Sequence, residues 1–295
     1  MCAAYVLGPG LDNKALRVFQ QPGWELEQLS PEHNAAPPDA VLVFGGDGTL
    51  HHQLDFLVRT LTPLLVVPCG SGNDFAKTLG LRTPSDSAEL WRQFCDAKAL
   101  VRKVDLGAIS LQDSTSQPTG PEIYFCNVAG AGLDAAANRR ANGQPPWLRA
   151  HGGYLAAALQ EILSNPARPR MTVRTRDGDD KIWLPSVAGP MTMIAIANTH
   201  RYGSGIRIAP RAQLDDAKLD LCAIRDATPA RLLKLFPLVR AGRHLGLPEV
   251  EYLQAEQLRI ETAEPMDIYA DGEFIGHTPA EVRVVPQALR VITPA

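Results

Sequence analysis

The first hundred residues alternate short apolar runs with segments of helical periodicity. The runs at 41–44 (VLVF) and 64–67 (LLVV) contain no polar residue, which is typical of strands covered by helices on both faces. Each run ends directly in a glycine-rich turn, and the segments that follow, 50–61 and 74–80, are predicted helices. This alternation is typical of a layered βαβ domain with a mostly parallel sheet.

Beyond residue 100 the pattern changes to short strands separated by turn-rich segments. We expect strands at 101–110, 123–128, 171–175, 191–197 and 219–224. This spacing favours an antiparallel sandwich or barrel. We therefore predict an α/β domain over residues 1–101 and a β-sandwich domain over 102–285. The apolar segment 289–292 predicts that a C-terminal strand, 286–295, returns to the first domain.

Two helical segments interrupt the second domain. Segment 153–163 places alanine and leucine at helical spacing. Segment 229–244 carries four basic residues and no acidic one among its leucines, as an amphipathic helix at a membrane surface would. Pro237 lies inside it and is expected to kink or split the helix.

Composition narrows the class of protein. The chain has 295 residues, 45% of them hydrophobic and 21% charged, with a net charge of -3, as in an ordinary globular protein. The absence of a basic excess argues against nucleic acid as a partner. The five cysteines are widely spaced, and the sequence shows no signal peptide and no long apolar span. We expect a cytoplasmic protein whose membrane contact, at the inner surface, is peripheral.

The first candidate motif is GGDGT at 45–49, between a predicted strand and a predicted helix. Glycines let the backbone approach a ligand closely, and the N–H groups at a helix start attract phosphate. A tight turn without a ligand is the alternative interpretation. Asp47 would repel phosphate unless a cation lay between them, and it therefore indicates magnesium.

The second motif, PCGSGNDFA at 68–76, occupies the same kind of position after the next strand. Open α/β sheets bind ligands at the carboxyl ends of such strands. The Ser71 hydroxyl is suited to donate to a phosphate oxygen. The side chain of Asn73 or Asp74 is expected to cap the following helix.

Together, GGDGTL at 45–50 and PCGSGNDFAKTLGL at 68–81 resemble the diacylglycerol-kinase-like family, which includes bacterial lipid kinases and is related to sphingosine and ceramide kinases. NAD kinases and phosphofructokinases resemble the chain in the first motif alone. Further matches follow in order at 104–107, 127–134, 203–210, 214–221 and 271–273, so the resemblance covers most of the chain.

The resemblance implies a fold and a reaction. The first domain would have the parallel sheet of NAD kinases and phosphofructokinases, and the second an antiparallel β-sandwich. The chain would be an ATP-dependent lipid kinase that transfers the γ-phosphoryl group to a hydroxyl of a diacylglycerol-like or sphingoid lipid, with ATP and Mg²⁺ as cofactors. Asp271 would be the base that accepts the hydroxyl proton.

The resemblance also assigns binding residues. Those expected to hold the nucleotide are Gly45, Gly46, Asp47, Gly48, Thr49, Leu50, His51, Gly70, Ser71, Asn73 and Glu273. Asp47, Asp74 and Asp105 would form the carboxylate network of the catalytic Mg²⁺. A second, structural Mg²⁺ would be held by the Asp216 carboxylate and by the backbone carbonyls of Gln213 and Lys218.

The chain departs from the family pattern at four places. Ser71 replaces the usual threonine and keeps its hydroxyl. His51 stands where asparagine is usual, and Ala217 stands where glycine usually follows the metal-site aspartate. Segment 1–39 lacks the usual opening motif, and its βα unit is expected to be short. Nucleotide contacts from this segment cannot be assigned.

Several alternatives stay open. Asp271 and Gly272 are also a strong hairpin signal, and Asp215 with Asp216 also fits a solvated loop. A soluble kinase of the NAD kinase type and a catalytically inactive nucleotide or lipid sensor are the other functions considered. A homodimer is left open. For a lipid acceptor, we expect Trp147 and Leu148, together with 153–163, to line its acyl chains.

Overall fold

A computed structural model describes residues 1–29, 36–145, 153–178, 180, 182–203 and 205–294. The chain forms two compact units, which we call unit 1 (residues 1–104 and 287–295) and unit 2 (residues 105–286). Two long strands, β5 (Leu100–Leu111) and β15 (Ala280–Thr293), contribute residues to both.

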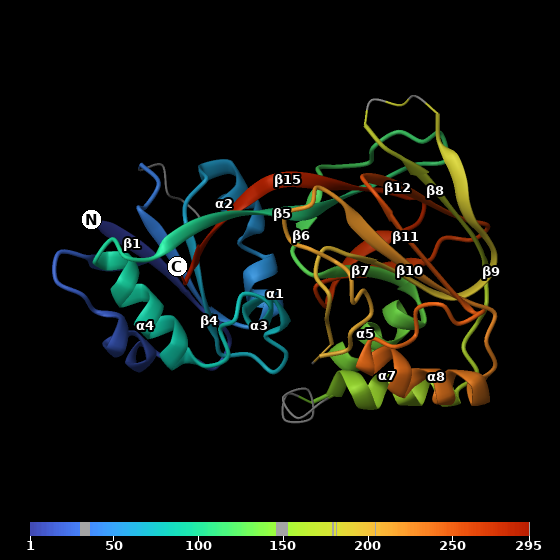
Figure 1. Ribbon diagram of the computed structural model, residues 1–295, viewed down its shortest axis with the longest axis horizontal. Helices are drawn as coiled ribbons and strands as arrows, with labels where there is room; N and C mark the ends of the chain where they lie inside the picture. The colour runs from blue at the N-terminus through green and yellow to red at the C-terminus, as the bar shows by residue number, and fades with distance from the viewer. Residues whose placement is uncertain (30–35, 146–152, 179, 181, 204, 295) are drawn as a thin grey trace. The chain divides into compact units, whose positions relative to one another are not determined.

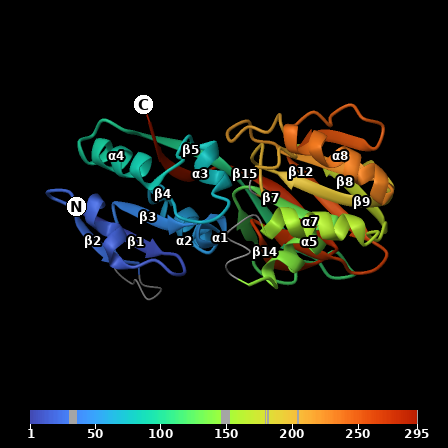
Figure 2. The same ribbon diagram turned by 90° about the horizontal axis from the view of Figure 1, so that it is seen from below.

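Unit 1 is built on a parallel sheet (Figure 2). Its strands are β1 (Cys2–Leu7), β2 (Glu25–Gln28), β3 (Ala40–Gly45), β4 (Leu64–Pro68) and the end of β15. They lie in the order β2–β1–β3–β4–β15 and all run parallel. Every residue of β3 and β4 is buried, as their uninterrupted apolar runs predict.

The helices of unit 1 are short. They are η1 (Asn13–Phe19), α1 (Asp47–His51), α2 (Leu54–Thr60), α3 (Asp74–Thr78) and α4 (Pro84–Cys95). The single helix predicted at 50–61 is in fact two, α1 and α2, and the short first βα unit contains only a 3₁₀ turn, η1. Helix α4 begins with a capping box between Thr83 and Asp86, and its Trp91 Nε1 donates to the Phe19 carbonyl of η1 at 2.7 Å.

Unit 2 consists of two antiparallel sheets that share one strand. Its further strands are β6 (Ile123–Phe125), β7 (Val128–Gly132), β8 (Arg170–Arg176), β9 (Leu184–Ala197), β10 (Leu219–Arg225), β11 (Val250–Ala255), β12 (Gln257–Thr262), β13 (Asp267–Ala270) and β14 (Glu273–His277). One sheet has the order β14–β13–β7–β9–β10–β11, and the other contains β9–β8–β12–β15 with β5 and β6. The first half of β9 pairs with β8, and its second half pairs with β7 and β10. The single strand predicted at 123–128 is split into β6 and β7.

Alternate residues of β9 face two different cores. Ile194 and Ile196 belong to the core of the sandwich, whereas Met193 and Ala195 pack toward three helices. These helices, α5 (Leu133–Asn142), α7 (Gly153–Leu163) and α8 (Pro229–Ala241), lie together on the outer face of the sheet (Figure 1). The sheet that carries β9 is therefore covered on both faces, which explains why segment 191–197 is apolar except for Thr192 although the sheet is antiparallel.

Helix α8 is not split at Pro237, contrary to one of the two outcomes expected for it. It runs to Ala241 and ends at Gly242, whose φ of 70° is the left-handed conformation typical of a helix terminus. Its apolar residues Leu232, Leu235 and Val239 are buried in unit 2. The apolar face of α8 is therefore used for packing.

Candidate active site

The two glycine turns of unit 1 are in direct contact. They follow β3 and β4, whose register pairs Gly45 with Pro68. A Cβ atom added to Gly70 would lie 2.4 Å from Gly46 Cα, far closer than side-chain carbons approach a backbone. Glycine at these two positions is therefore what lets the turns touch.

Asp47 connects the first turn to the helix that follows the second. Its Oδ2 accepts a hydrogen bond from Asp74 N and its Oδ1 accepts one from Phe75 N, both at 3.0 Å. Asn73 is the residue directly before α3. It adopts the left-handed conformation, with φ 53°, and its side chain makes no cap bond. The expectation that Asn73 caps this helix is wrong, and Asp47 accepts from the first two amides of the helix from the neighbouring turn.

Asn73 instead closes its own turn. Its Oδ1 accepts from Gly70 N at 2.8 Å, and its Nδ2 donates to Gly70 O at 2.6 Å. Lys77 Nζ donates to Gly72 O at 2.6 Å. The conformation of the second turn is therefore fixed by the side chains of Asn73, which precedes α3, and of Lys77 in α3.

The remaining residues of the predicted nucleotide site differ in exposure. Leu50 is buried in the core of unit 1, so any contact it makes with a nucleotide is through its backbone. Ser71 is exposed, and the ring of His51 packs edge-on against His52. The side chain of Thr49 fills the space beside Gly45, where an added Cβ would lie 2.5 Å from it.

One further residue at this strand end was missed by the sequence reasoning. Gly8 follows β1, its N–H donates to Phe44 O at 2.7 Å, and an added Cβ would lie 2.9 Å from Thr49 Oγ1. The sequence signal was the Gly-Pro-Gly segment at 8–10, directly after the first apolar run. A third turn thus borders GGDGT within unit 1.

In unit 2, Asp271 is at the tip of the β13–β14 hairpin. Asp271 and Gly272 have φ angles of 51° and 90°, so both central residues of the turn are left-handed, as in a type I′ hairpin. The Asp271 carboxylate accepts hydrogen bonds from Cys126 N and Asn127 N, both at 2.8 Å. The hairpin interpretation and a fixed carboxylate are therefore both realised.

Asp105 lies in the same part of unit 2. Its Oδ2 accepts from Ala217 N at 2.7 Å, and its side chain is buried. Asn198, which the sequence reasoning missed, donates from Nδ2 to Asp105 O at 2.9 Å and to Cys126 O at 3.0 Å. Cys126 N in turn donates to Asp271, so one buried amide connects the surroundings of the two predicted carboxylates.

The predicted structural metal loop is closed by local hydrogen bonds. Asp216 Oδ1 accepts from Lys218 N at 3.1 Å, and its Oδ2 accepts from Gln254 Nε2 at 3.3 Å. Ala217 adopts φ 57°, the conformation that glycine favours. Among the residues that the structure describes, no group of three or more His, Cys, Asp or Glu side chains is arranged to hold a metal.

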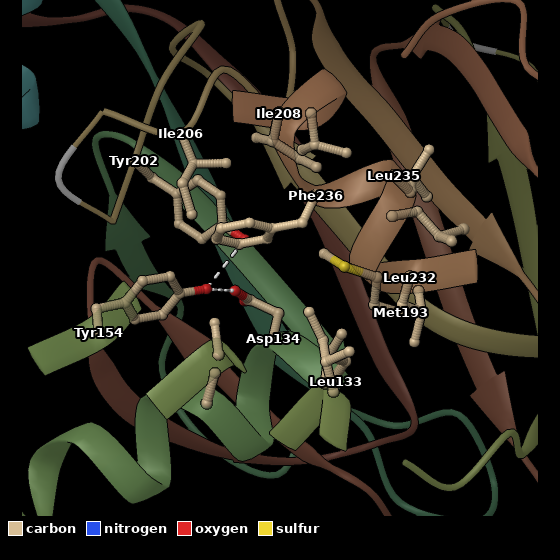
Figure 3. A pocket seen from close by; sticks show the side chains of 15 residues that line it. Leu133, Asp134, Tyr154, Met193, Tyr202, Ile206, Ile208, Leu232, Leu235 and Phe236 are labelled. Atoms are coloured by element: carbon tan, nitrogen blue, oxygen red, sulfur yellow. Dashed lines mark hydrogen bonds between the residues drawn. The ribbon is translucent and has the colours of Figure 1, made fainter. Parts of the chain in front are cut away.

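Unit 2 also contains an apolar pocket bordered by α5, α7 and α8 (Figure 3). Helix α7, which was expected to contact acyl chains, contributes Tyr154, Ala158 and Ile162 to the lining. Trp147 and Leu148, named in the same expectation, lie outside the described residues. Apart from Asp134 and the two tyrosines, Tyr154 and Tyr202, the lining of this pocket is aliphatic or aromatic.

Comparisons with known proteins identify relatives of both units. Family models match residues 15–109 (diacylglycerol kinase catalytic domain) and residues 127–293 (YegS C-terminal NAD kinase beta sandwich-like domain). The chain is 34% identical over 258 residues to a diacylglycerol kinase of Mycobacterium tuberculosis, which covers 87% of this chain and 77% of that protein. It is 28% identical over 289 residues to a probable lipid kinase YegS-like of Chromohalobacter salexigens, covering 95% and 84%.

Solved structures agree on the fold. A putative diacylglycerol kinase from Bacillus anthracis superposes with a TM-score of 0.74 at 20% identity, covering 99% of this chain and 94% of that one. Yeast NADH kinase complexed with NADH gives a TM-score of 0.56 at 10% identity, covering 100% and 83%. The predicted combination of an NAD kinase-like α/β sheet and an antiparallel β-sandwich is confirmed.

Proposed function

The chain belongs to the diacylglycerol kinase family and is a lipid kinase, and from this premise we propose that it transfers the γ-phosphoryl group of ATP to a hydroxyl of a diacylglycerol-like or sphingoid lipid. The observation that carries the catalytic assignment is the carboxylate of Asp271, held by two backbone amides at a hairpin tip. The named relatives are lipid kinases, and the likeness to an NADH kinase is one of fold. Neither the soluble kinase nor the inactive sensor gains support.

The nucleotide would lie on the glycine turns of unit 1. Phosphoryl transfer requires positioning and charge neutralisation more than covalent help from the protein. Gly45 to Thr49 and Gly70 to Asn73 form two adjoining turns, and Ser71 adds an exposed hydroxyl. These features support the proposed contacts with the phosphates.

Asp47 and Asp74 have the donor chemistry that Mg²⁺ prefers. They are neighbours in unit 1, with Asp47 Oδ2 3.0 Å from Asp74 N. Each Asp47 oxygen accepts one backbone N–H, which fixes the orientation of the carboxylate. Asp105, in unit 2, is proposed as the third member. Bound Mg²⁺ would neutralise the charge of the phosphates.

The structural Mg²⁺ proposed for Gln213, Asp216 and Lys218 is tested differently. Asp216 already closes its loop by hydrogen bonds, so a metal would add stability to an existing turn. A melting temperature of the purified protein that does not change between Mg²⁺ and a chelator would refute this second site.

Asp271 would accept the proton of the lipid hydroxyl as it attacks. Each of its oxygens accepts one backbone N–H at 2.8 Å, which fixes the orientation of the carboxylate. The orientation of a general base decides its efficiency. The two amide bonds are therefore part of the proposed mechanism.

The test is phosphoryl transfer from radiolabelled ATP to a panel of lipids in mixed micelles, with NAD included as a soluble acceptor. Asp271→Asn is expected to lower kcat by roughly 10²–10⁴-fold, the usual contribution of a general base, with ATP binding retained. Asp267→Asn is the matched control, because Asp267 begins β13, the strand that leads to Asp271, and pairs with Arg139 at 2.8 Å. Equal activity of the two variants would refute the role of Asp271.

Peripheral contact with an anionic membrane is part of the proposal. No helix of the described residues is long and apolar enough to cross a membrane. Arg231 of α8 is paired with Glu249 at 2.9 Å, whereas Lys234 and Arg240 are exposed and suited to anionic headgroups. Lys234→Glu with Arg240→Glu is expected to weaken binding to anionic vesicles. Unchanged binding would exclude α8 as the contact.

A further inference from the structure

The two residues between β6 and β7, Cys126 and Asn127, lie outside the ladders of both strands. The pairing of β5 with β6 ends at Gly107 and Phe125, and the pairing of β7 with β9 begins at Val128. Both residues are buried, so their backbone N–H and C=O groups need partners from elsewhere in the fold. We call these two residues the 126–127 connection.

All four backbone groups of the 126–127 connection are paired. The N–H groups of Cys126 and Asn127 donate to the two carboxylate oxygens of Asp271, both at 2.8 Å. On the other side, the Cys126 carbonyl accepts from Asn198 Nδ2 at 3.0 Å, and the Asn127 carbonyl accepts from Asn198 N at 2.8 Å. Asp271 and Asn198 therefore hold the same two residues, one from the N–H side and the other from the C=O side.

One peptide group joins the Asn198 side chain to the carboxylate. The Cys126 carbonyl and the Asn127 N–H are the two ends of a single planar peptide group, so a hydrogen bond accepted at one end orients the bond donated at the other. Acceptance at the carbonyl also polarises the group and strengthens its N–H as a donor. The amide of Asn198 therefore acts on the Asp271 carboxylate through this group.

The Asn198 amide is itself held in one orientation. Asn198 is fully buried and directly follows β9, whose last residues pair with β7 on one side and with β10 on the other. Its Nδ2 also donates to Asp105 O at 2.9 Å. Two carbonyl oxygens thus face this end of the amide, and only the amino group can donate to them.

A purely structural connection explains this amide poorly. Asn198 Oδ1 is buried, and no donor to it is found within the part of the chain that the structure describes. A buried acceptor without a donor lowers stability. Thr192, earlier in β9, is a contrasting case: its hydroxyl donates to Arg225 O at 3.0 Å and accepts from Ala227 N at 3.2 Å. Asn198 retains an amide at a cost in stability, and the peptide group that it holds is the one beside the proposed base.

We propose that Asn198 is a positioning residue for phosphoryl transfer, which orients the Asp271 carboxylate through the peptide group between Cys126 and Asn127. The inference rests on the proposed function, because it takes Asp271 to be the base. Without the Asn198 side chain this peptide group is less restrained, while the Cys126 N–H still reaches the carboxylate. A misplacement of about 1 Å costs about 100-fold in rate, so a partial loss of orientation is expected to cost about 10-fold.

The first test measures the steady-state kinetics of Asn198→Ala in the lipid kinase assay. We expect kcat to fall about 10-fold with unchanged KM values for ATP and lipid, because the interaction lost is one that orients the base. Thr192→Val is the matched control: it removes a buried group that joins two backbone positions on the same strand, and it should lower the melting temperature but not kcat. Asn198→Ser, whose hydroxyl can still donate to one carbonyl, is the milder change should Asn198→Ala fold poorly. A kcat equal to that of wild type would overturn the proposal.

The second test is a double-mutant cycle with Asp271→Asn. If Asn198 acts through the Asp271 carboxylate, the loss caused by Asn198→Ala should largely disappear once that carboxylate is absent. We expect Asn198→Ala to lower the residual kcat of Asp271→Asn by less than about twofold. A further loss of about 10-fold in that background would mean that Asn198 acts independently of Asp271, against the proposal.

Hydrogen exchange separates this inference from the proposed function, because it requires no turnover. The N–H groups of Cys126 and Asn127 should exchange roughly two- to tenfold faster in Asn198→Ala than in wild type, and at the wild-type rate in Thr192→Val. Unchanged exchange of both amides in Asn198→Ala overturns the proposal even where lipids are phosphorylated. If both amides respond but wild type phosphorylates no lipid, Asn198 still positions Asp271, and it is the proposed function that fails.

Discussion

Removing the carboxylate of Asp47 should loosen α3 and with it the second glycine turn. Asp47 is the acceptor for the first two amides of this helix, at 3.0 Å each, although it lies 27 and 28 residues before them in the chain. The first N–H groups of an α-helix have no acceptor within the helix, and the side chain of Asn73, the residue before α3, makes no cap bond to them. Asp47→Ala would leave both donors without this acceptor.

The magnitude follows from the contacts. A hydrogen bond to a charged group contributes about 1.5–3 kcal/mol, and loss of a helix cap costs about 0.5–2 kcal/mol. The two bonds share one carboxylate and one helix, so their contributions do not add fully. We expect Asp47→Ala to lower the free energy of unfolding by about 2–4 kcal/mol. Asp47→Asn, which keeps one acceptor oxygen and loses the charge, should lower it by about half as much.

Hydrogen exchange resolves the effect because it reports on α3 itself. Exchange in segment 68–81 should accelerate in Asp47→Ala, and the urea midpoint should fall. Asp55→Ala is the control: Asp55 is a nearby exposed aspartate paired with Arg59 at 3.0 Å, and an exposed pair contributes at most about 0.5 kcal/mol. If the amides of segment 68–81 exchange equally slowly in Asp47→Ala and Asp55→Ala, the proposed connection between the two turns is wrong.

Three further predictions concern unit 2. Ala217→Gly should raise the free energy of unfolding by about 0.5–1 kcal/mol, and with it the urea midpoint, because φ of 57° is strained for alanine; an unchanged or lower midpoint would contradict this. Gly130→Ala should lower the melting temperature, with about 1–3 kcal/mol lost, since its Cβ would lie 2.0 Å from Asp134 Oδ2; tolerance would contradict the close contact. Burial lowers the pKa of His244, so the unfolded state binds more protons between that pKa and about 6.5, and stability should fall as the pH drops through this window. His244→Gln should flatten this dependence of the urea midpoint on pH.

The local features of the fold were predictable because they depend on neighbouring residues. The apolar runs that became β3 and β4 are continuous in the sequence, and so are the glycine turns that follow them. The hairpin at Asp271 is signalled by its own Asp-Gly pair. The capping box of α4, Thr83 to Asp86, was equally readable but was not used in the prediction.

Features that depend on distant residues were not predictable in this way. The side chain that caps α3 belongs to the preceding motif, and Asn198 joins segments 72 and 93 residues away. The basic pattern of 229–244 indicated an amphipathic helix, but amphipathicity does not specify what covers the apolar face. In α8 that face packs in unit 2, and Arg231 pairs with Glu249, which lies outside segment 229–244.

Backbone groups position the carboxylates proposed for phosphoryl transfer. A side chain positions the carboxyl of Asp134 in the pocket bordered by α5, α7 and α8. Asp47, Asp105 and Asp271 each accept from backbone N–H groups, which belong to the start of α3 for Asp47 and to segments between strands for the other two. A backbone donor survives substitution of its own side chain, so Cys126→Ala should preserve the amide that orients Asp271. The pocket carboxyl of Asp134 instead accepts from Tyr154, which a single substitution removes. A single side-chain substitution can therefore release the Asp134 carboxyl, while the geometry of the proposed catalytic carboxylates, fixed by the main chain, is less sensitive to such changes.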